Sequence, residues 1–254
     1  MKLAALVVVA IAACDPPPPA AAAPATPTPA APRAPVKRPA PRNPILVLGM
    51  GEDPKLTAQV EQVRAANHVA AIGLAVVRGP IVTLAVAGTL PGANKPLESS
   101  DRLTLRGWND AVTASIAARL VDRGVLGWDA VDPKLGTNDL VTIVEHAGGK
   151  PWPELVHDEV FVPLGMADCV AAPSSISCSL ADWARFAAAH AGSFAGNWLT
   201  PVSRDHVSQW VHGSGDTVLS LGKRSAVAVF AVGTAPGAAT AAKQIVDAQL
   251  APAN

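Results

Sequence analysis

The sequence contains one Ser-x-x-Lys pair, Ser220 and Lys223. On a helix, residues three apart share a face, so the lysine amine can take the serine proton while the oxygen attacks an acyl carbon. This pair instead lies where one apolar run, 217–221, ends and a glycine-containing stretch leads to a second, 226–232, which is typical of a β-hairpin. A hairpin serine lacks the free N–H groups of a helix start. We therefore expect no nucleophile at Ser220.

Residues 101–129 predict the helix on which such chemistry would need to stand. Apolar side chains recur every fourth position over 112–120, as on the buried face of a helix. Asn109 and Asp110 precede that run, and both residue types favour the N-cap of a helix. A catalytic use of Asp110 is the alternative to this capping role.

The run Ala111–Ala114, with Leu120, Val121 and Gly124 after it, resembles the active-site helix of the serine β-lactamase-like family. That family contains class C β-lactamases, D-alanyl-D-alanine carboxypeptidases and related esterases, and its Ser-x-x-Lys motif opens this helix. Aligned on the run, Gly107 takes the serine position and Asp110 the lysine position. Glycine cannot be acylated, and a carboxylate near a helix start is a weak base. The resemblance implies that the family's fold is kept while its catalytic residues are lost.

The family's two other motifs are degenerate as well. The chain has no tyrosine, so it cannot supply the family's Tyr-x-Asn motif, which would fall on residues 132–134. A family insertion before that motif is missing, which implies a shallower cleft. The third motif, [KH]-[TSA]-G, falls on 212–215, where His212 matches and Ser214 replaces the glycine. His212 is either a functional remnant or an ordinary turn residue.

Further blocks of the chain match the family in the same order. They are residues 149–155, 160–166, 178–186 and 199–203, and the resemblance spans about 55–250. It implies an α+β fold of the β-lactamase/transpeptidase type, shortened, with an antiparallel sheet flanked by helices.

The apolar patterns predict elements that agree with such a fold. Asp53 is expected to cap a helix that starts at Pro54 and runs to about Asn67. Two β-branched runs, 69–77 and 81–87, predict a hairpin. Further helices are expected over 141–149 and 238–250.

The N-terminal residues predict export and a tether. Residues 1–13 carry one lysine and an apolar run, which is typical of a secretory signal. The run Ile11–Cys14 resembles the bacterial lipobox, so Cys14 is expected to be lipidated; a plain signal peptide is the alternative. Residues 14–44, rich in Pro and Ala, predict an extended linker before a folded domain over 45–254. We expect a lipid-anchored protein of the bacterial cell envelope, on the periplasmic side or the outer membrane.

Composition and cysteine spacing narrow the chemistry further. Half of the 254 residues are hydrophobic and the formal net charge is zero, which provides no argument for nucleic acid. Export favours a disulfide between Cys169 and Cys178, with two free thiols as the alternative. No metal-binding spacing occurs among the six histidines, so we expect neither a metal site nor a cofactor.

Three hypotheses about function follow. The first is a non-catalytic envelope domain that binds a protein, peptidoglycan or a peptide. The second is an active serine hydrolase of esterase or peptidase type, with a rebuilt site in which His212 is the base and an unidentified serine the nucleophile. The third is a decaying gene product, which a lack of cooperative melting would favour.

Overall fold

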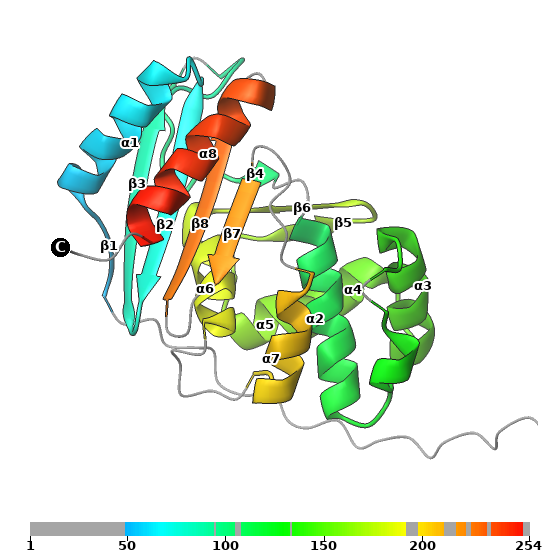
Figure 1. Cartoon of the computed structure of the whole chain (residues 1–254). Helices are drawn as coiled ribbons and strands as arrows, with labels where there is room; N and C mark the ends of the chain where they lie inside the picture. The colour runs from blue at the N-terminus through cyan, green and yellow to red at the C-terminus, as the bar shows by residue number, and fades with distance from the viewer. Residues whose placement is uncertain are drawn as a thin grey trace, which may run out of the picture. The chain divides into compact units, whose positions relative to one another are not determined.

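The computed structural model describes residues 49–93, 95–104, 108–132, 134–191, 198–210, 217–221, 225–232 and 235–250. The chain divides into two units, 1–35 and 36–254, and every described residue belongs to the second. The elements of that unit are shown in Figure 1 and run in this order: β1 Met50–Glu52, α1 Pro54–Ala66, β2 Ala71–Arg78, β3 Ile81–Gly88, β4 Leu103–Thr104, α2 Trp108–Asp122, η1 Trp128–Ala130, α3 Thr137–Gly148, α4 Trp152–Val156, η2 His157–Phe161, α5 Val162–Leu164, β5 Val170–Ala172, β6 Ser175–Cys178, α6 Leu180–His190, α7 Pro201–Ser208, β7 Thr217–Leu221, β8 Ser225–Val232 and α8 Ala235–Leu250.

A five-stranded sheet with the order β1-β3-β2-β8-β7 forms one half of the described unit. Neighbouring strands are antiparallel except for the short edge strand β1, which runs parallel to β3. The sheet is therefore mixed, where the sequence predicted an antiparallel one. The three residues of β1 carry too short a pattern to be recognised as a strand.

Both faces of this sheet are covered. Ile72, Leu74 and Val76 of β2 pack in a cluster with residues of α1 and α8, while Ala75 and Val77 belong to the core shared with α6. This alternation follows from the two-residue period of a strand. In Figure 1, α1 and α8 lie on one side of the sheet and α6 on the other.

The second half contains α2, α3, α4, η2, α5 and α7, together with a three-stranded sheet of order β4-β6-β5. Helix α2 lies at its centre, and ten of its fifteen residues are buried. A helix that is apolar nearly all round must be buried. The alanines and other small side chains of α2 allow neighbouring elements to pack against it from several directions. The helix that would carry catalysis is thus a core element.

The helices and hairpins predicted from the sequence are present, with small differences in their bounds. Asp53 caps α1, because its Oδ1 accepts from the N–H of Lys55 at 2.8 Å. The predicted hairpins are present as β2–β3 and β7–β8. Helix α3 starts at Thr137, four residues before the expected start. The π-helical turn η2 was not expected, because nothing in a sequence pattern distinguishes it from an α-helical turn.

Candidate functional site

The start of α2 is the position at which the sequence resemblance places the family's Ser-x-x-Lys motif. Trp108, the first residue of the helix, is 2% exposed and packs edge-on against Trp183 of α6, with ring centroids 4.4 Å apart. Strand β4 precedes the helix and pairs with β6, Leu103 opposite Cys178. Aromatic packing and strand pairing therefore hold both sides of this helix start. Gly107 and His212 lie outside the described residues.

Asp110, at the position of the family lysine, binds a neighbouring helix. Its Oδ1 accepts a hydrogen bond from Thr137 Oγ1 at 2.5 Å, and Thr137 is the first residue of α3. Asn109 Nδ2 donates to the backbone oxygen of Ser174, in the β5–β6 turn, at 2.8 Å. Both residues lie within the first turn of α2. The predicted N-cap role is therefore wrong for both, because tertiary partners use their side chains.

The two hydroxyl groups inside α2 are unavailable to a substrate. Thr113 and Ser115 are both fully buried. Thr113 Oγ1 donates to the backbone oxygen of Asn109 at 2.6 Å and accepts from Trp152 Nε1 at 2.9 Å. Ser115 Oγ donates to the backbone oxygen of Ala111 at 2.7 Å. These hydroxyls therefore serve packing within and between helices.

Ser115 also meets a histidine, yet the pair is not a catalytic dyad. His190 Nε2 lies 3.2 Å from Ser115 Oγ. The serine proton already belongs to the shorter bond to the Ala111 oxygen, so the imidazole donates to the serine and cannot take its proton. Burial, together with a smaller effect of the charge of Arg204, lowers the pKa of His190 to about 3. His190 is a neutral core residue packed against Phe186 and Trp198.

The remaining motif positions show structural contacts where they are described. Asp132 Oδ1 accepts from the N–H of Lys134 at 2.8 Å, so the carboxylate at the family tyrosine position closes a local turn. Ser220 lies on strand β7, which confirms the expected hairpin. Within the described ranges, no group of three or more His, Cys, Asp or Glu side chains could hold a metal ion.

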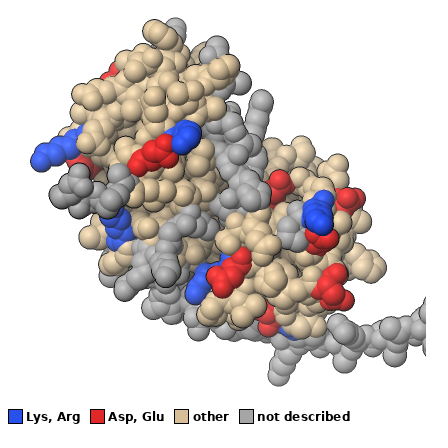
Figure 2. All heavy atoms as spheres, in the orientation of Figure 1, with Lys and Arg blue, Asp and Glu red and all other residues tan. Residues whose placement is uncertain are grey.

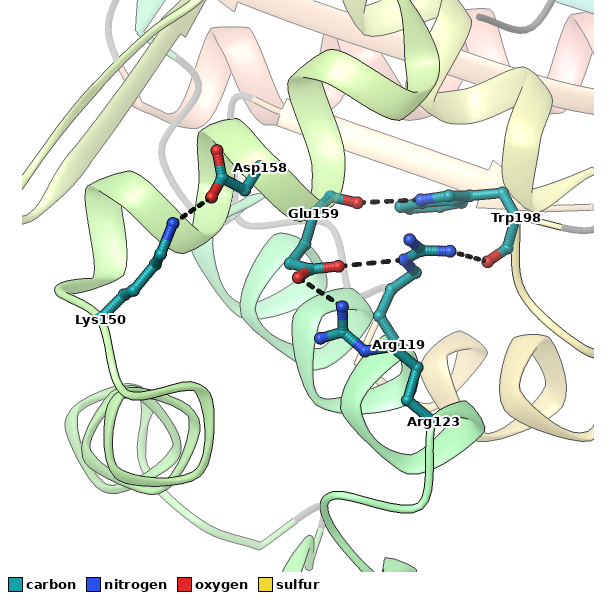
Figure 3. A network of polar contacts seen from close by, with 6 residues as sticks. All are labelled: Arg119, Arg123, Lys150, Asp158, Glu159 and Trp198. Atoms are coloured by element: carbon teal, nitrogen blue, oxygen red, sulfur yellow. Dashed lines mark hydrogen bonds and ion pairs between the residues drawn. The ribbon is translucent and has the colours of Figure 1, made fainter. Parts of the chain in front are cut away.

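A buried charge network was missed by sequence reasoning. Glu159, in η2, has a side chain only 4% exposed. Its Oε1 accepts from Arg123 Nη1 at 2.8 Å and its Oε2 from Arg119 Nε at 3.3 Å, while Trp198 Nε1 donates to its backbone oxygen at 3.0 Å (Figure 3). The sequence signal was a glutamate that directly precedes the apolar residues Val160 and Phe161. The network joins the C-terminal end of α2, and the residue that follows it, to η2.

A disulfide closes the β5–β6 hairpin. Cys169 and Cys178 are bonded, with a Cα–Cα distance of 4.2 Å. Cys169 directly precedes β5 and Cys178 ends β6. The same hairpin accepts the hydrogen bond of Asn109, and Ser177 meets Thr104 of β4 at 2.6 Å. The covalent link therefore stiffens the segment that lies against the start of α2.

The fold built by these elements is that of the serine β-lactamases and penicillin-binding-protein-like enzymes. The sequence itself matches no protein-family model and no curated protein. The likeness is therefore one of structure.

Three solved structures illustrate this likeness. SurE, solved with D-Leu, is 14% identical, with a TM-score of 0.59 over 78% of this chain and 74% of its own. D-amino acid amidase from Ochrobactrum anthropi SV3, solved with L-phenylalanine amide, is 12% identical, with a TM-score of 0.57 over 77% and 97%. A class C β-lactamase from Rhodobacter sphaeroides is 11% identical, with a TM-score of 0.58 over 78% and 100%. At these identities the likeness shows the fold alone.

Proposed function

We propose that this chain is an envelope lipoprotein whose serine-hydrolase-like domain is non-catalytic and acts by binding. The observation that carries the proposal is the hydrogen bond from Thr137 to Asp110. In an active relative, this helix position holds an amine that takes the proton of the nucleophile. Here it holds a carboxylate that joins two helices.

The hydroxyl groups near this position support the same conclusion. Those of Thr113 and Ser115 are buried and donate to backbone oxygens of their own helix. The three residues before α2 are Leu105, Arg106 and Gly107, none of which carries a hydroxyl group. An acyl group would therefore find no acceptor in this stretch of the chain.

The expected ligand is peptide-like. Two of the structural neighbours were solved with D-Leu and with L-phenylalanine amide, which favours a peptide or the peptide part of peptidoglycan over other partners. On the face seen in Figure 2, acidic and basic side chains occur in small mixed groups. Such a surface gives a polyanion little attraction.

A labelling experiment tests the absence of catalysis. The purified protein is incubated with a fluorescent penicillin and with a fluorophosphonate, beside an active class C β-lactamase as the positive control. We expect a covalent adduct on the control alone. Robust labelling of this protein that disappears when one serine is changed to alanine would refute the proposal.

The lipid anchor is tested separately. Cells that express the full chain are fed a radioactive fatty acid, and the protein is expected to carry the label in the membrane fraction. The variant Cys14→Ser should lose the label, because the thiol is the acylation site of a lipobox. Label that persists in this variant would exclude Cys14 as the anchor.

An active serine hydrolase remains the second candidate, because His212 stands at the third motif position with its imidazole intact. This candidate predicts hydrolysis of a simple acyl ester that His212→Ala abolishes. The matched control is His146→Ala, which removes an exposed imidazole from α3. Equal, background-level hydrolysis by all three proteins would eliminate this candidate.

A further inference from the structure

We propose that a pocket beside η2 and α5 binds one apolar side chain of an extended, uncharged peptide segment. The pocket has a volume of about 290 Å³ and is lined by His157, Phe161, Val162, Gly165, Met166, Ala167 and Cys169. None of these residues belongs to α2 or to the positions of the family's three catalytic motifs. The inference goes beyond the proposed function, because it holds whether or not the start of α2 is catalytic.

The volume and lining of the pocket select the kind of ligand. At about 290 Å³ this pocket lies at the lower end of the range of roughly 300 to 1,000 Å³ that is typical of small-molecule sites, so it can accept one large apolar side chain. Phe161 and Met166, each 3% exposed, are apolar lining residues that are otherwise buried. Val162 is 44% exposed, and Val170, next to the lining residue Cys169, is 49% exposed. Apolar surface therefore continues outside the pocket, as a peptide contact requires.

His157 supplies the polar contact. Its side chain is 63% exposed, and its Nδ1 lies 3.2 Å from Asp158 Oδ1. The carboxylate can only accept, so Nδ1 carries a hydrogen, and in the neutral imidazole Nε2 then offers a lone pair. A peptide N–H is a suitable donor for that nitrogen. Lys150 Nζ lies 2.5 Å from Asp158 Oδ2, so these two charges offset each other and favour an uncharged ligand (Figure 3).

The wall of the pocket is held in place before any ligand arrives. Cys169 is tied to Cys178 by the disulfide. The N–H of Asp168 donates to Asp182 Oδ2 at 2.7 Å, which fixes the residue between Ala167 and Cys169. A preformed wall spares the ligand the entropy cost of ordering it.

Methionine signals offer a direct test. The chain has three methionines, of which Met166 lines the pocket and Met50 lies on β1 as an internal control. The full chain is prepared with isotope-labelled methionine methyl groups and titrated with N-acetyl-leucine amide and N-acetyl-phenylalanine amide. We expect a saturable shift of the Met166 signal with a Kd on the order of 1 mM, as suits a ligand of this size. The Met50 signal should stay in place, and N-acetyl-glycine amide, which lacks the side chain, should shift neither signal.

Two variants locate the contact. Val162→Arg should abolish the shift because the larger side chain obstructs the opening, while the matched control Val202→Arg, at a site 60% exposed on α7, should bind normally. His157→Ala should weaken binding about fivefold, the effect of one lost hydrogen bond. The proposal is overturned if Met166 shows no shift up to about 20 mM peptide. It is also overturned if glycine amide acts as well as leucine amide, or if Val162→Arg binds as tightly as the unchanged chain.

Discussion

Acid should destabilise this protein through His190. Burial lowers the pKa of His190 to about 3 in the folded chain, against an ordinary value of 6.5. A histidine whose folded pKa is depressed contributes full stability above 6.5, and that stability is lost progressively as the pH falls from 6.5 toward 3, because the unfolded chain binds the proton first. Each pH unit in that window costs about 1.4 kcal/mol. At pH 4.5, two units below 6.5, the loss is therefore roughly 3 kcal/mol.

Urea unfolding at pH 7 and pH 4.5 measures this loss, and variants separate His190 from the other titrating groups. His190→Phe keeps an aromatic ring among Phe186 and Trp198 but cannot titrate. Between pH 7 and pH 4.5, the free energy of unfolding of this variant should fall by about 3 kcal/mol less than that of the unchanged protein. Ser115→Ala should keep the full pH dependence, because burial is the largest cause of the lowered pKa. Equal pH dependence in His190→Phe and the unchanged protein would refute this reasoning.

Three further changes have predictable effects on stability. Glu159→Gln should lower the free energy of unfolding by about 3 kcal/mol, because two partly buried arginines lose their counter-charge. The control Asp247→Asn, in an exposed ion pair, should lower it by under about 1 kcal/mol. Urea unfolding of the two variants measures both effects. Reduction of the Cys169–Cys178 bond should cost roughly 2–3 kcal/mol, read from the melting temperature with and without a reductant. Gly73→Ala should destabilise by about 1–3 kcal/mol, because its new Cβ would lie 2.0 Å from a phenylalanine ring of β8; a melting temperature equal to that of the unchanged chain would contradict this.

The candidate site was only partly predictable from the sequence. The family pattern led to Asp110 and to the start of α2, but the residue types alone favoured capping for Asn109 and Asp110. The contacts that decide their roles come from Thr137 and Ser174, which lie 27 and 65 residues further along the chain. No local propensity contains such partners. Glu159 was missed for the same reason, since its arginines lie near the C-terminal end of α2 and directly after it, 40 and 36 residues earlier.

The sequence by itself determined the local elements. Alternating β-branched residues specify β2, β3 and β8, and Asp53 with Pro54 marks the start of α1, because such patterns act between near neighbours. Tertiary structure alone decided which side chains meet. It placed β1 parallel to β3, buried His190 against Ser115 and formed the pocket around Met166. Burial and long-range contacts produce these features, and both depend on how distant segments pack.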